Sequence, residues 1–278
     1  MKLIADAGST KIEWILTNDG TEIKRCTTAG YNPYYYEKDL LRRAIKDNLM
    51  DSIGQVEAQE VYYYGSGCST EGNNEKVRSV IVEFFPKATI EVGHDLLGAA
   101  RGLCGRNPGI ACIMGTGSNS CYYDGVDVVA NVESVGWLFG DKASGAHIGK
   151  SFIGAFLTKE CPKALRDIFT ETTSLDFDKV LSKIYSEGNP HKFFAQASYF
   201  VGDHIEHPFM EQIVRASFRE FFLENVCKYE KHREVPVNCA GSVALVFENL
   251  MRSEAEKLGL TIGSIIKAPT DNLVKFHG

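Results

Sequence analysis

Residues 3–11 read LIADAGSTK, and residues 110–119 read IACIMGTGSN. Each stretch is an apolar strand, followed by a turn of small and hydroxyl-bearing residues, and each leads into another strand. Such a turn lets the backbone approach an anion closely and presents several N–H and O–H donors at once. The same residue types also build ordinary tight β-hairpins. Because the two turns occupy matching places in two halves of the chain, the pattern favours a pair of phosphate-binding loops.

The first half of the chain predicts the order β-β-β-α-β-α-β, with a further helix behind it. Apolar runs bounded by turn residues indicate the strands, and apolar residues at helical spacing indicate the helices. We expect strands at residues 3–5, 12–16, 22–27, 61–64 and 88–92, and helices at 37–49, 75–85 and 96–103.

A turn-rich segment at 105–109 separates this half from a second one with a similar order. The second half therefore predicts the same unit with a helical insertion. We expect strands at residues 110–114, 120–123, 126–130, 235–240 and 260–267, helical segments between 144 and 231, and a helix at 243–258. A duplicated α/β unit implies two lobes with a cleft between their strand ends, where ligands of α/β folds often bind.

Composition narrows the class of protein. The 278 residues suffice for two domains, and 44% hydrophobic with 24% charged residues is ordinary for a globular protein. A net charge of −6 argues against nucleic acid or an anionic membrane as the main partner. The eight scattered cysteines form no Cys-x-x-Cys pair, so we expect reduced, mostly buried thiols, no zinc or iron–sulfur site within one chain, and a cytoplasmic location. No secretory signal or membrane-spanning segment is expected.

Four short motifs in a fixed order resemble a known family. They are the first loop with Asp6, the GTGSN run at 115–119, the Gly-Trp and Gly-Asp pairs within 136–141, and Ala-Gly-Ser at 240–242. The ordered set resembles the sugar kinases of the actin/hexokinase/Hsp70 superfamily, and within it the N-acetylglucosamine kinase and BadF/BadG-type ATPase family. The resemblance implies a two-lobed, ribonuclease H-like actin fold. Its lobes would be residues 1–105 with the tail 268–278, and residues 106–267.

The resemblance assigns the nucleotide to three turns. In the family, the first loop holds the β- and γ-phosphates and its acidic residue lies near Mg²⁺, which maps onto Asp6, Gly8, Ser9 and Thr10. Gly115 and Thr116 would also contact the nucleotide, and Gly241 with Ser242 resembles the adenosine motif. From the residues alone, Asp6 also fits a carboxylate that shapes its own turn, and Gly241 fits a glycine that starts a β-to-α turn.

Asp95 maps onto the general base of the family. A carboxylate there can accept the proton of an attacking sugar hydroxyl. Asp95 also stands directly before the helix expected at 96–103, where an N-cap is the ordinary role. The adjacent His94 is interpreted as a packing or hydrogen-bonding residue.

The resemblance also implies a sugar site. Asn and Asp side chains can bridge neighbouring hydroxyls, because each offers two polar atoms at a fixed spacing. By itself, Asn32 before Pro33 reads as a simple turn. The sugar-binding residues implied by the family are Asn32, Thr116, Gly117, Ser118, Asn119 and Asp141.

The chain departs from the family pattern beside Asp141. Lys142 stands where the family carries an acidic residue, and the segment Ala146–Gly149 lacks a bulky aromatic that is often found there, with a histidine at 147. Ala7 replaces a glycine in the first loop. The identity of the sugar therefore transfers less securely than ATP binding.

These observations predict an ATP- and Mg²⁺-dependent kinase that phosphorylates a hydroxyl of a small amino sugar, N-acetylglucosamine or a related N-acetylated hexosamine. The resemblance suggests a homodimer. Two alternatives stay open: an ATPase that activates a radical dehydratase or reductase through a shared iron–sulfur cluster, and a sugar sensor without turnover. Cys112 and Cys121 lie on predicted strands, which favours burial over cluster ligation.

Overall fold

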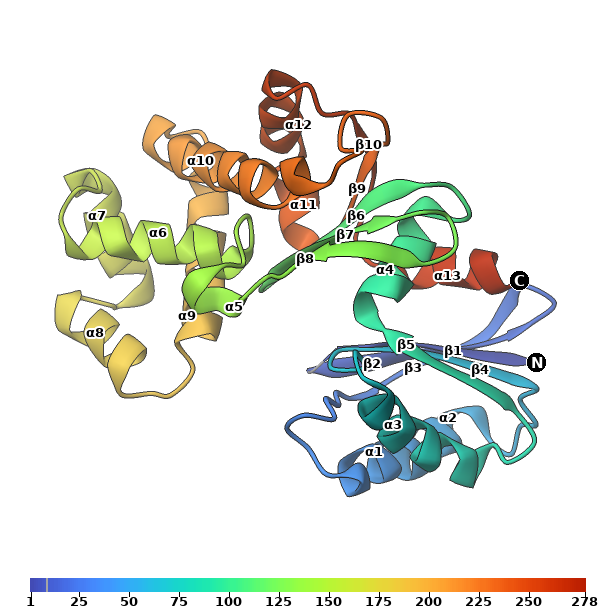
Figure 1. The fold of residues 1–278 in the computed structure, drawn as a ribbon. Helices are drawn as coiled ribbons and strands as arrows, with labels where there is room; N and C mark the ends of the chain where they lie inside the picture. Colours follow the sequence, from blue (N-terminus) through green and yellow to red (C-terminus); the bar gives the residue numbers. More distant parts are fainter. Residues whose placement is uncertain (9) are drawn as a thin grey trace. The chain divides into compact units, whose positions relative to one another are not determined.

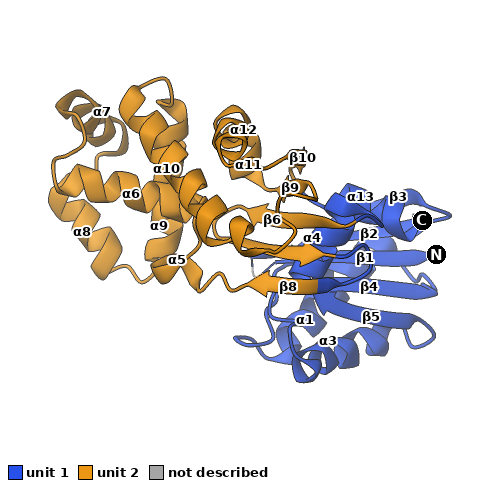
Figure 2. Cartoon of the chain, turned by 45° about the horizontal axis from the view of Figure 1, so that its top comes forward, with its two compact units in different colours: residues 1–107, 124–128, 268–278 blue, residues 108–123, 129–267 orange. Residues whose placement is uncertain are grey.

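The computed structural model describes residues 1–8 and 10–278, and the chain forms two compact units (Figure 1, Figure 2). Unit 1 comprises residues 1–107, 124–128 and 268–278, and unit 2 comprises residues 108–123 and 129–267. The chain thus leaves unit 1 for unit 2, returns to unit 1 briefly at residues 124–128, and ends in unit 1 at residues 268–278.

Unit 1 contains a five-stranded sheet in the order β3-β2-β1-β4-β5. β1 pairs antiparallel with β2, which pairs antiparallel with β3, whereas β1, β4 and β5 run parallel. Short apolar strands such as β1, buried on both faces, form the centre of the sheet. The strands are β1 (Lys2–Ala7), β2 (Lys11–Asn18), β3 (Thr21–Ala29), β4 (Glu60–Gly65) and β5 (Thr89–His94).

The helices of unit 1 extend beyond their predicted ranges in two places. The helix expected at 37–49 continues to residue 53 and contains one wider π-turn, η1. α3 begins four residues early because the Thr70 hydroxyl accepts a hydrogen bond from the Asn73 N–H and caps it. The helices are α1 (Lys38–Ala44), η1 (Ile45–Leu49), α2 (Met50–Ile53), α3 (Glu71–Phe84), α4 (Asp95–Cys104) and α13 (Thr270–His277).

The C-terminal helix α13 was not predicted from the sequence. It packs on the face of the unit 1 sheet opposite the larger core, where Leu273 and Val274 join Ile4, Ile15 and Tyr64 in a small apolar cluster. α13 also contacts α4. It therefore covers one face of the sheet that carries the first loop.

Unit 2 repeats the sheet of unit 1 in the order β8-β7-β6-β9-β10. β6 pairs antiparallel with β7 and parallel with β9, as β1 pairs with β2 and β4. The predicted duplicated α/β fold is confirmed. The strands are β6 (Gly109–Met114), β7 (Ser118–Tyr123), β8 (Val128–Val132), β9 (Val237–Ala240) and β10 (Ile262–Ile266).

Helices make up most of unit 2. An aromatic cluster that includes Phe152, Phe169 and Phe200 packs α6, α7 and α9 together, with ring centroids 5.1 Å apart. The helix expected at 243–258 is divided in two at Phe247, whose backbone leaves the helical region. The helices are α5 (Gly136–Phe139), α6 (Gly145–Leu157), α7 (Lys163–Thr173), α8 (Phe177–Tyr185), α9 (Pro190–Asp203), α10 (Pro208–Glu224), η2 (Val226–Lys228), α11 (Ser242–Val246) and α12 (Glu248–Lys257).

These elements bear on two expectations from the sequence, one about the burial of cysteines and one about membrane-spanning segments. Cys112 and Cys121 are fully buried in β6 and β7, so the predicted burial of these thiols is confirmed. Among residues 1–8 and 10–278, no helix is both long enough and apolar enough to cross a bilayer.

Candidate functional site

The first loop forms the turn between β1 and β2 in unit 1. Asp6 lies opposite Glu13 in the β1–β2 ladder. The Gly8 N–H donates to the Lys11 carbonyl at 2.9 Å, and the Gly8 carbonyl accepts from the Tyr31 N–H at 3.3 Å. Thr10 is exposed. The remaining predicted residue of this loop, Ser9, lies outside the residues that the structure describes.

Asp95 is the first residue of α4, and both of its carboxylate oxygens accept hydrogen bonds. The Ser66 hydroxyl donates to Oδ2 at 2.8 Å, and the Leu96 N–H donates to Oδ1 at 2.9 Å. The cap position itself belongs to His94, whose Nδ1 also accepts from the Leu96 N–H, so the predicted hydrogen-bonding role of His94 is confirmed. The Asp95 side chain is 33% exposed. Its carboxylate is therefore held in one orientation while remaining open to a reactant.

Asp6 and Asp95 act on each other electrostatically. Burial, and next the negative charges of Asp95 and Glu13, raise the pKa of Asp6 to about 6, while Lys11 opposes the shift. Like charges that disfavour each other's ionisation mark a place where a cation is favoured. Mg²⁺ commonly binds through one or two carboxylates together with substrate phosphates. Asp6 fits such a ligand, although no group of three or more potential metal ligands occurs among the residues described.

Sequence reasoning missed the loop at 65–68, which connects the predicted residues of unit 1. The Ser66 N–H donates to the Ala7 carbonyl at 2.9 Å, while the Ser66 hydroxyl holds Asp95. Gly67 packs so closely on Asn32 that an added Cβ would lie 2.4 Å from the amide oxygen. The available signal was the Gly-Ser-Gly run after β4, which has the same composition as the two loops that were recognised.

Asn32 occupies the turn that leads toward α1. Its side chain is largely buried, and its Oδ1 accepts a hydrogen bond from the Tyr34 N–H at 3.0 Å. This is the turn geometry that the residues alone indicated. Asn32, Ser66 and Asp95 are thus linked within unit 1 through one loop.

A cavity of about 250 Å³ in unit 2 brings together three predicted nucleotide-binding residues, Gly115, Thr116 and Ser242. Gly115 and Thr116 follow β6, and their carbonyls accept the Gly145 and Ala146 N–H groups at the start of α6. Apolar side chains, including Val243, Val246 and Phe247, supply much of the remaining wall. A mostly apolar cavity with a few polar groups suits a planar base and a ribose.

Gly241 is required by the backbone at the edge of this cavity. Its φ is +129°, and a Cβ there would lie 2.1 Å from the Met114 carbonyl oxygen. Its N–H donates to the Ile266 carbonyl at 2.9 Å. A glycine therefore holds the end of β9 against β6 and lets α11 begin at Ser242.

One wall of the cavity comes from α9, which sequence analysis did not single out. Ser198, Tyr199, Gly202 and Asp203 line it, one helical turn apart. The recurrence of polar or small residues at helical spacing, at 198, 199, 202 and 203, was the available signal. It was weak because the insertion contains many helices of similar composition.

Three of the predicted sugar-binding residues of unit 2, Gly117, Ser118 and Asp141, meet at the loop before α6. The Ser118 N–H donates to the Asp141 carboxylate, and Gly117 packs against it, since an added Cβ would lie 2.8 Å from Oδ2. Burial is the main cause that raises the pKa of Asp141. The Asn119 Oδ1 instead accepts a hydrogen bond from the amide of Asn131 at 3.1 Å.

Solved structures of other proteins share this architecture. The chain is 35% identical to a protein from Porphyromonas gingivalis provisionally named an N-acetylglucosamine kinase, covering 100% of this chain and 98% of that one with a TM-score of 0.94. A protein of the same provisional name from Chromobacterium violaceum is 16% identical over 100% and 98% of the two chains, with a TM-score of 0.77. A ROK family glucokinase from Streptomyces griseus, in complex with glucose and AMPPNP, is 12% identical over 99% and 97%, with a TM-score of 0.53.

The two more distant structures share the fold. No sequence profile of a known family matches the chain, and no curated protein matches it either. The likeness to the Porphyromonas gingivalis protein extends over the full length of both chains, and the four motifs occur in the family's order. The chain therefore belongs to the N-acetylglucosamine kinase and BadF-type ATPase family of the actin/hexokinase/Hsp70 superfamily.

Proposed function

We propose that this protein transfers the γ-phosphoryl group of ATP to a hydroxyl of N-acetylglucosamine or a related N-acetylated hexosamine. The observation that carries the proposal is the Asp95 carboxylate, held by Ser66 and the Leu96 N–H beside a second carboxylate, Asp6. The name of the Porphyromonas gingivalis relative supports the class of sugar.

Asp95 is the general base of the proposed reaction. It takes the proton of the sugar hydroxyl while the hydroxyl oxygen forms a bond to the γ-phosphorus, and the bond from that phosphorus to the bridging oxygen of ADP breaks. The hydrogen bonds from Ser66 and Leu96 fix the carboxylate in one rotamer. Orientation of this kind contributes to phosphoryl transfer because the reaction needs positioning more than covalent help.

The cavity of unit 2 is the proposed site for the adenosine part of ATP. Its volume, its apolar wall and the glycine at 241 support this assignment, and the fold is shared with a glucokinase bound to AMPPNP. Gly8, Ser9 and Thr10 are proposed to bind phosphate oxygens through N–H and O–H groups. Asn32 and Asp141, with the loop at 116–119, are proposed to bind the sugar.

Asp6 is the residue proposed to hold Mg²⁺. Bound there, the metal ion would neutralise phosphate charge. The carboxylate suits this role because burial and two neighbouring carboxylates disfavour its negative charge, which Lys11 offsets only in part. A cation that binds at Asp6 relieves this repulsion.

A coupled ADP-release assay tests the proposal. Wild-type protein with Mg²⁺-ATP is assayed against a panel of hexoses, amino sugars and N-acetylated sugars, beside Asp95→Asn and the matched control Asp51→Asn on the exposed surface of α2. We expect release only with an N-acetylated hexosamine, and a kcat about 10²- to 10⁴-fold lower in Asp95→Asn. Equal ADP release with and without every sugar would contradict the kinase and favour an ATPase.

A further inference from the structure

The loop that carries Asp141 has an unusual backbone. Asp141 and Ala143 have φ angles of +48° and +57°, in the left-handed region that residues with a Cβ avoid. Such a conformation costs about 1–3 kcal/mol per residue and persists only where its surroundings impose it. The segment from Gly140 to Ser144 is therefore held by contacts from other elements.

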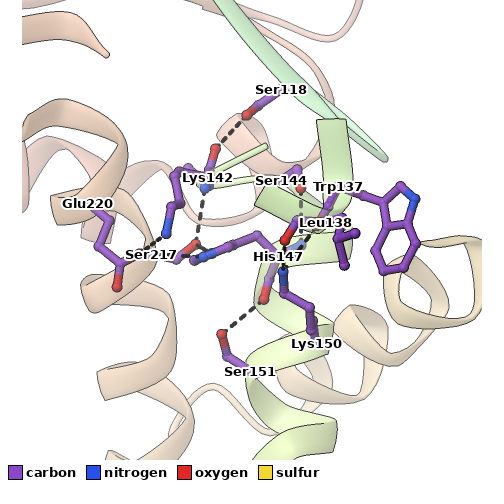
Figure 3. Close-up of polar contacts among 11 residues, drawn as sticks. Ser118, Trp137, Leu138, Lys142, Ser144, His147, Lys150, Ser151, Ser217 and Glu220 are labelled. Atoms are coloured by element: carbon purple, nitrogen blue, oxygen red, sulfur yellow. Dashed lines mark hydrogen bonds and ion pairs between the residues drawn. The ribbon is translucent and has the colours of Figure 1, made fainter. Parts of the chain in front are cut away.

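Two hydroxyls hold this loop from either side. The Ser118 hydroxyl donates to the Lys142 carbonyl at 2.6 Å, and the Ala143 N–H donates to the Ser217 hydroxyl oxygen at 3.1 Å (Figure 3). Ser118 belongs to β7, and Ser217 belongs to α10. The loop is thus fixed between the sheet and the helical insertion of unit 2.

A carboxylate on α10 adds an ionic contact. Glu220 Oε2 lies 2.7 Å from Lys142 Nζ and 3.4 Å from His147 Nε2. The side chains of Lys142, His147, Ser217 and Glu220 converge in Figure 3, with Glu220 and Ser217 coming from α10. Lys142, and the segment 146–149 that contains His147, are places where the sequence departs from the family pattern beside Asp141, and both Lys142 and His147 contact the same carboxylate.

His147 joins the hydroxyl to the carboxylate. Burial, with a contribution from Lys142, lowers the pKa of His147 to about 4, so its ring is neutral at neutral pH. Nδ1 lies 2.7 Å from the Ser217 hydroxyl oxygen. With the single proton on Nε2, the ring faces Glu220 as a donor and accepts from Ser217 at Nδ1, which leaves the Ser217 oxygen to accept from Ala143.

We propose that Ser217 and Glu220 are positioning residues for Asp141, holding its loop in the left-handed conformation that presents the carboxylate to the sugar. The inference rests on the proposed function, because it assumes that Asp141 binds the sugar. It adds two residues from a helix about 75 positions further along the chain, as the separations of 74 and 78 residues in the hydrogen bonds show.

The test compares Glu220→Gln with Glu211→Gln. Glu211 is on the same helix, forms a 2.7 Å ion pair with Arg215 and has a similar exposure, 39% against 43%. We expect Glu220→Gln to raise the KM for N-acetylglucosamine about tenfold, with the KM for ATP within about twofold of wild type. The Glu211→Gln control should change neither value.

Exchanging the charges of Lys142 and Glu220 distinguishes loss of their ion pair from a general loss of structure. The single variant Lys142→Glu should weaken sugar binding as Glu220→Gln does, and the double variant Lys142→Glu with Glu220→Lys should recover at least half of the lost affinity. A single variant that loses affinity for sugar and ATP equally, or a sugar KM unchanged in Glu220→Gln, would overturn the positioning role.

Calorimetric titration with N-acetylglucosamine separates this inference from the proposed function. If wild-type protein binds the sugar but releases no ADP, the kinase proposal fails, and weaker binding by Glu220→Gln still supports the positioning role. If wild type and Glu220→Gln bind the sugar equally, the positioning role fails alone. A wild type that binds no sugar overturns both.

Discussion

The two units share one strand order but use it for different chemistry. In each, a parallel neighbour of the central strand ends in a Gly-Ser pair, Gly65-Ser66 after β4 and Gly241-Ser242 after β9. In unit 1, the serine hydroxyl binds the Asp95 carboxylate, whereas in unit 2 the serine lines an apolar cavity. The same turn therefore serves a charged site in one unit and a largely uncharged one in the other.

The difference follows from what surrounds each turn. In unit 1, burial raises the pKa of Asp6, and the nearby carboxylates of Asp95 and Glu13 raise it further. In unit 2, α9 and α11 surround the turn mainly with apolar and small polar side chains, together with the single carboxylate of Asp203 among the residues that line the cavity. A duplicated sheet thus fixes where a loop lies, and the residues packed around that loop determine its chemistry.

The largest expected effect comes from a substitution that disrupts the Gly241-Ser242 turn of unit 2. Gly241→Ala forces a Cβ against the Met114 carbonyl at a φ of +129°, so we expect a loss of about 3 kcal/mol or more in unfolding free energy and of ATP binding. Urea unfolding and nucleotide titration measure the two losses. The matched control is Gly259→Ala, which has a φ of +71° with nothing within 4 Å, and which should cost only about 1 kcal/mol. Equal costs at the two glycines would contradict the steric argument.

The next largest effect tests whether the raised pKa of Asp6 makes the stability of the protein depend on pH. The raised pKa of Asp6 means that the folded protein binds this proton more tightly than the unfolded chain, so stability falls as pH rises from about 4 to about 6. Asp6→Asn should remove that fall and raise the unfolding free energy at pH 7 by about 1–3 kcal/mol, while kinase activity is lost. Unfolding measured at pH 4, 5, 6 and 7 checks the slope.

Asp47→Asn on the exposed surface of η1 is the control for this slope. It should leave the pH dependence of stability unchanged. An Asp6→Asn protein that is less stable than wild type at pH 7 would show that Asp6 is a structural anchor of its turn, the alternative that the residues alone left open.

The smallest expected effect distinguishes the role of Ser66 from that of Ser242 in the two Gly-Ser pairs. Ser66→Ala removes the hydrogen bond to Asp95 Oδ2, so we expect kcat to fall about tenfold with the KM for ATP unchanged. Ser242→Ala should instead raise the KM for ATP a few fold and leave kcat near wild type. Steady-state kinetics on both variants decides the matter, since identical kinetic changes would mean that the turns are not specialised.

Much of the fold could be predicted because its strands are short, apolar and bounded by turn residues. The two loops at 6–10 and 115–119 were visible since their small residues interrupt buried strands. The helix α13 was missed because it is short and mostly polar, although Leu273, Val274 and His277 are buried on it. Its stability comes from packing on the sheet rather than from its own sequence.

The site could be predicted only where its residues stand in local motifs. Asp95 stands at the start of a helix, Asp141 directly follows a glycine, and Asp6 lies two residues before Gly8 in the first loop. Ser66 lacked a long motif, and Glu220 has none, because its role depends on Lys142 from a distant loop. Contacts between elements that are far apart in sequence carry no local signal, so the structure was needed to find them.

The return of the chain to unit 1 has a consequence for synthesis on the ribosome. The apolar face formed by Ile4, Ile15 and Tyr64 is covered by Leu273 and Val274, which emerge from the exit tunnel after all of unit 2. Throughout translation of the intervening residues, α4 can pack on this face through Leu97 but α13 is still missing, and domains generally fold as units as they emerge. Unit 2 should therefore mature before unit 1, and the nascent N-terminal sheet should be a binding site for chaperones until the last helix docks.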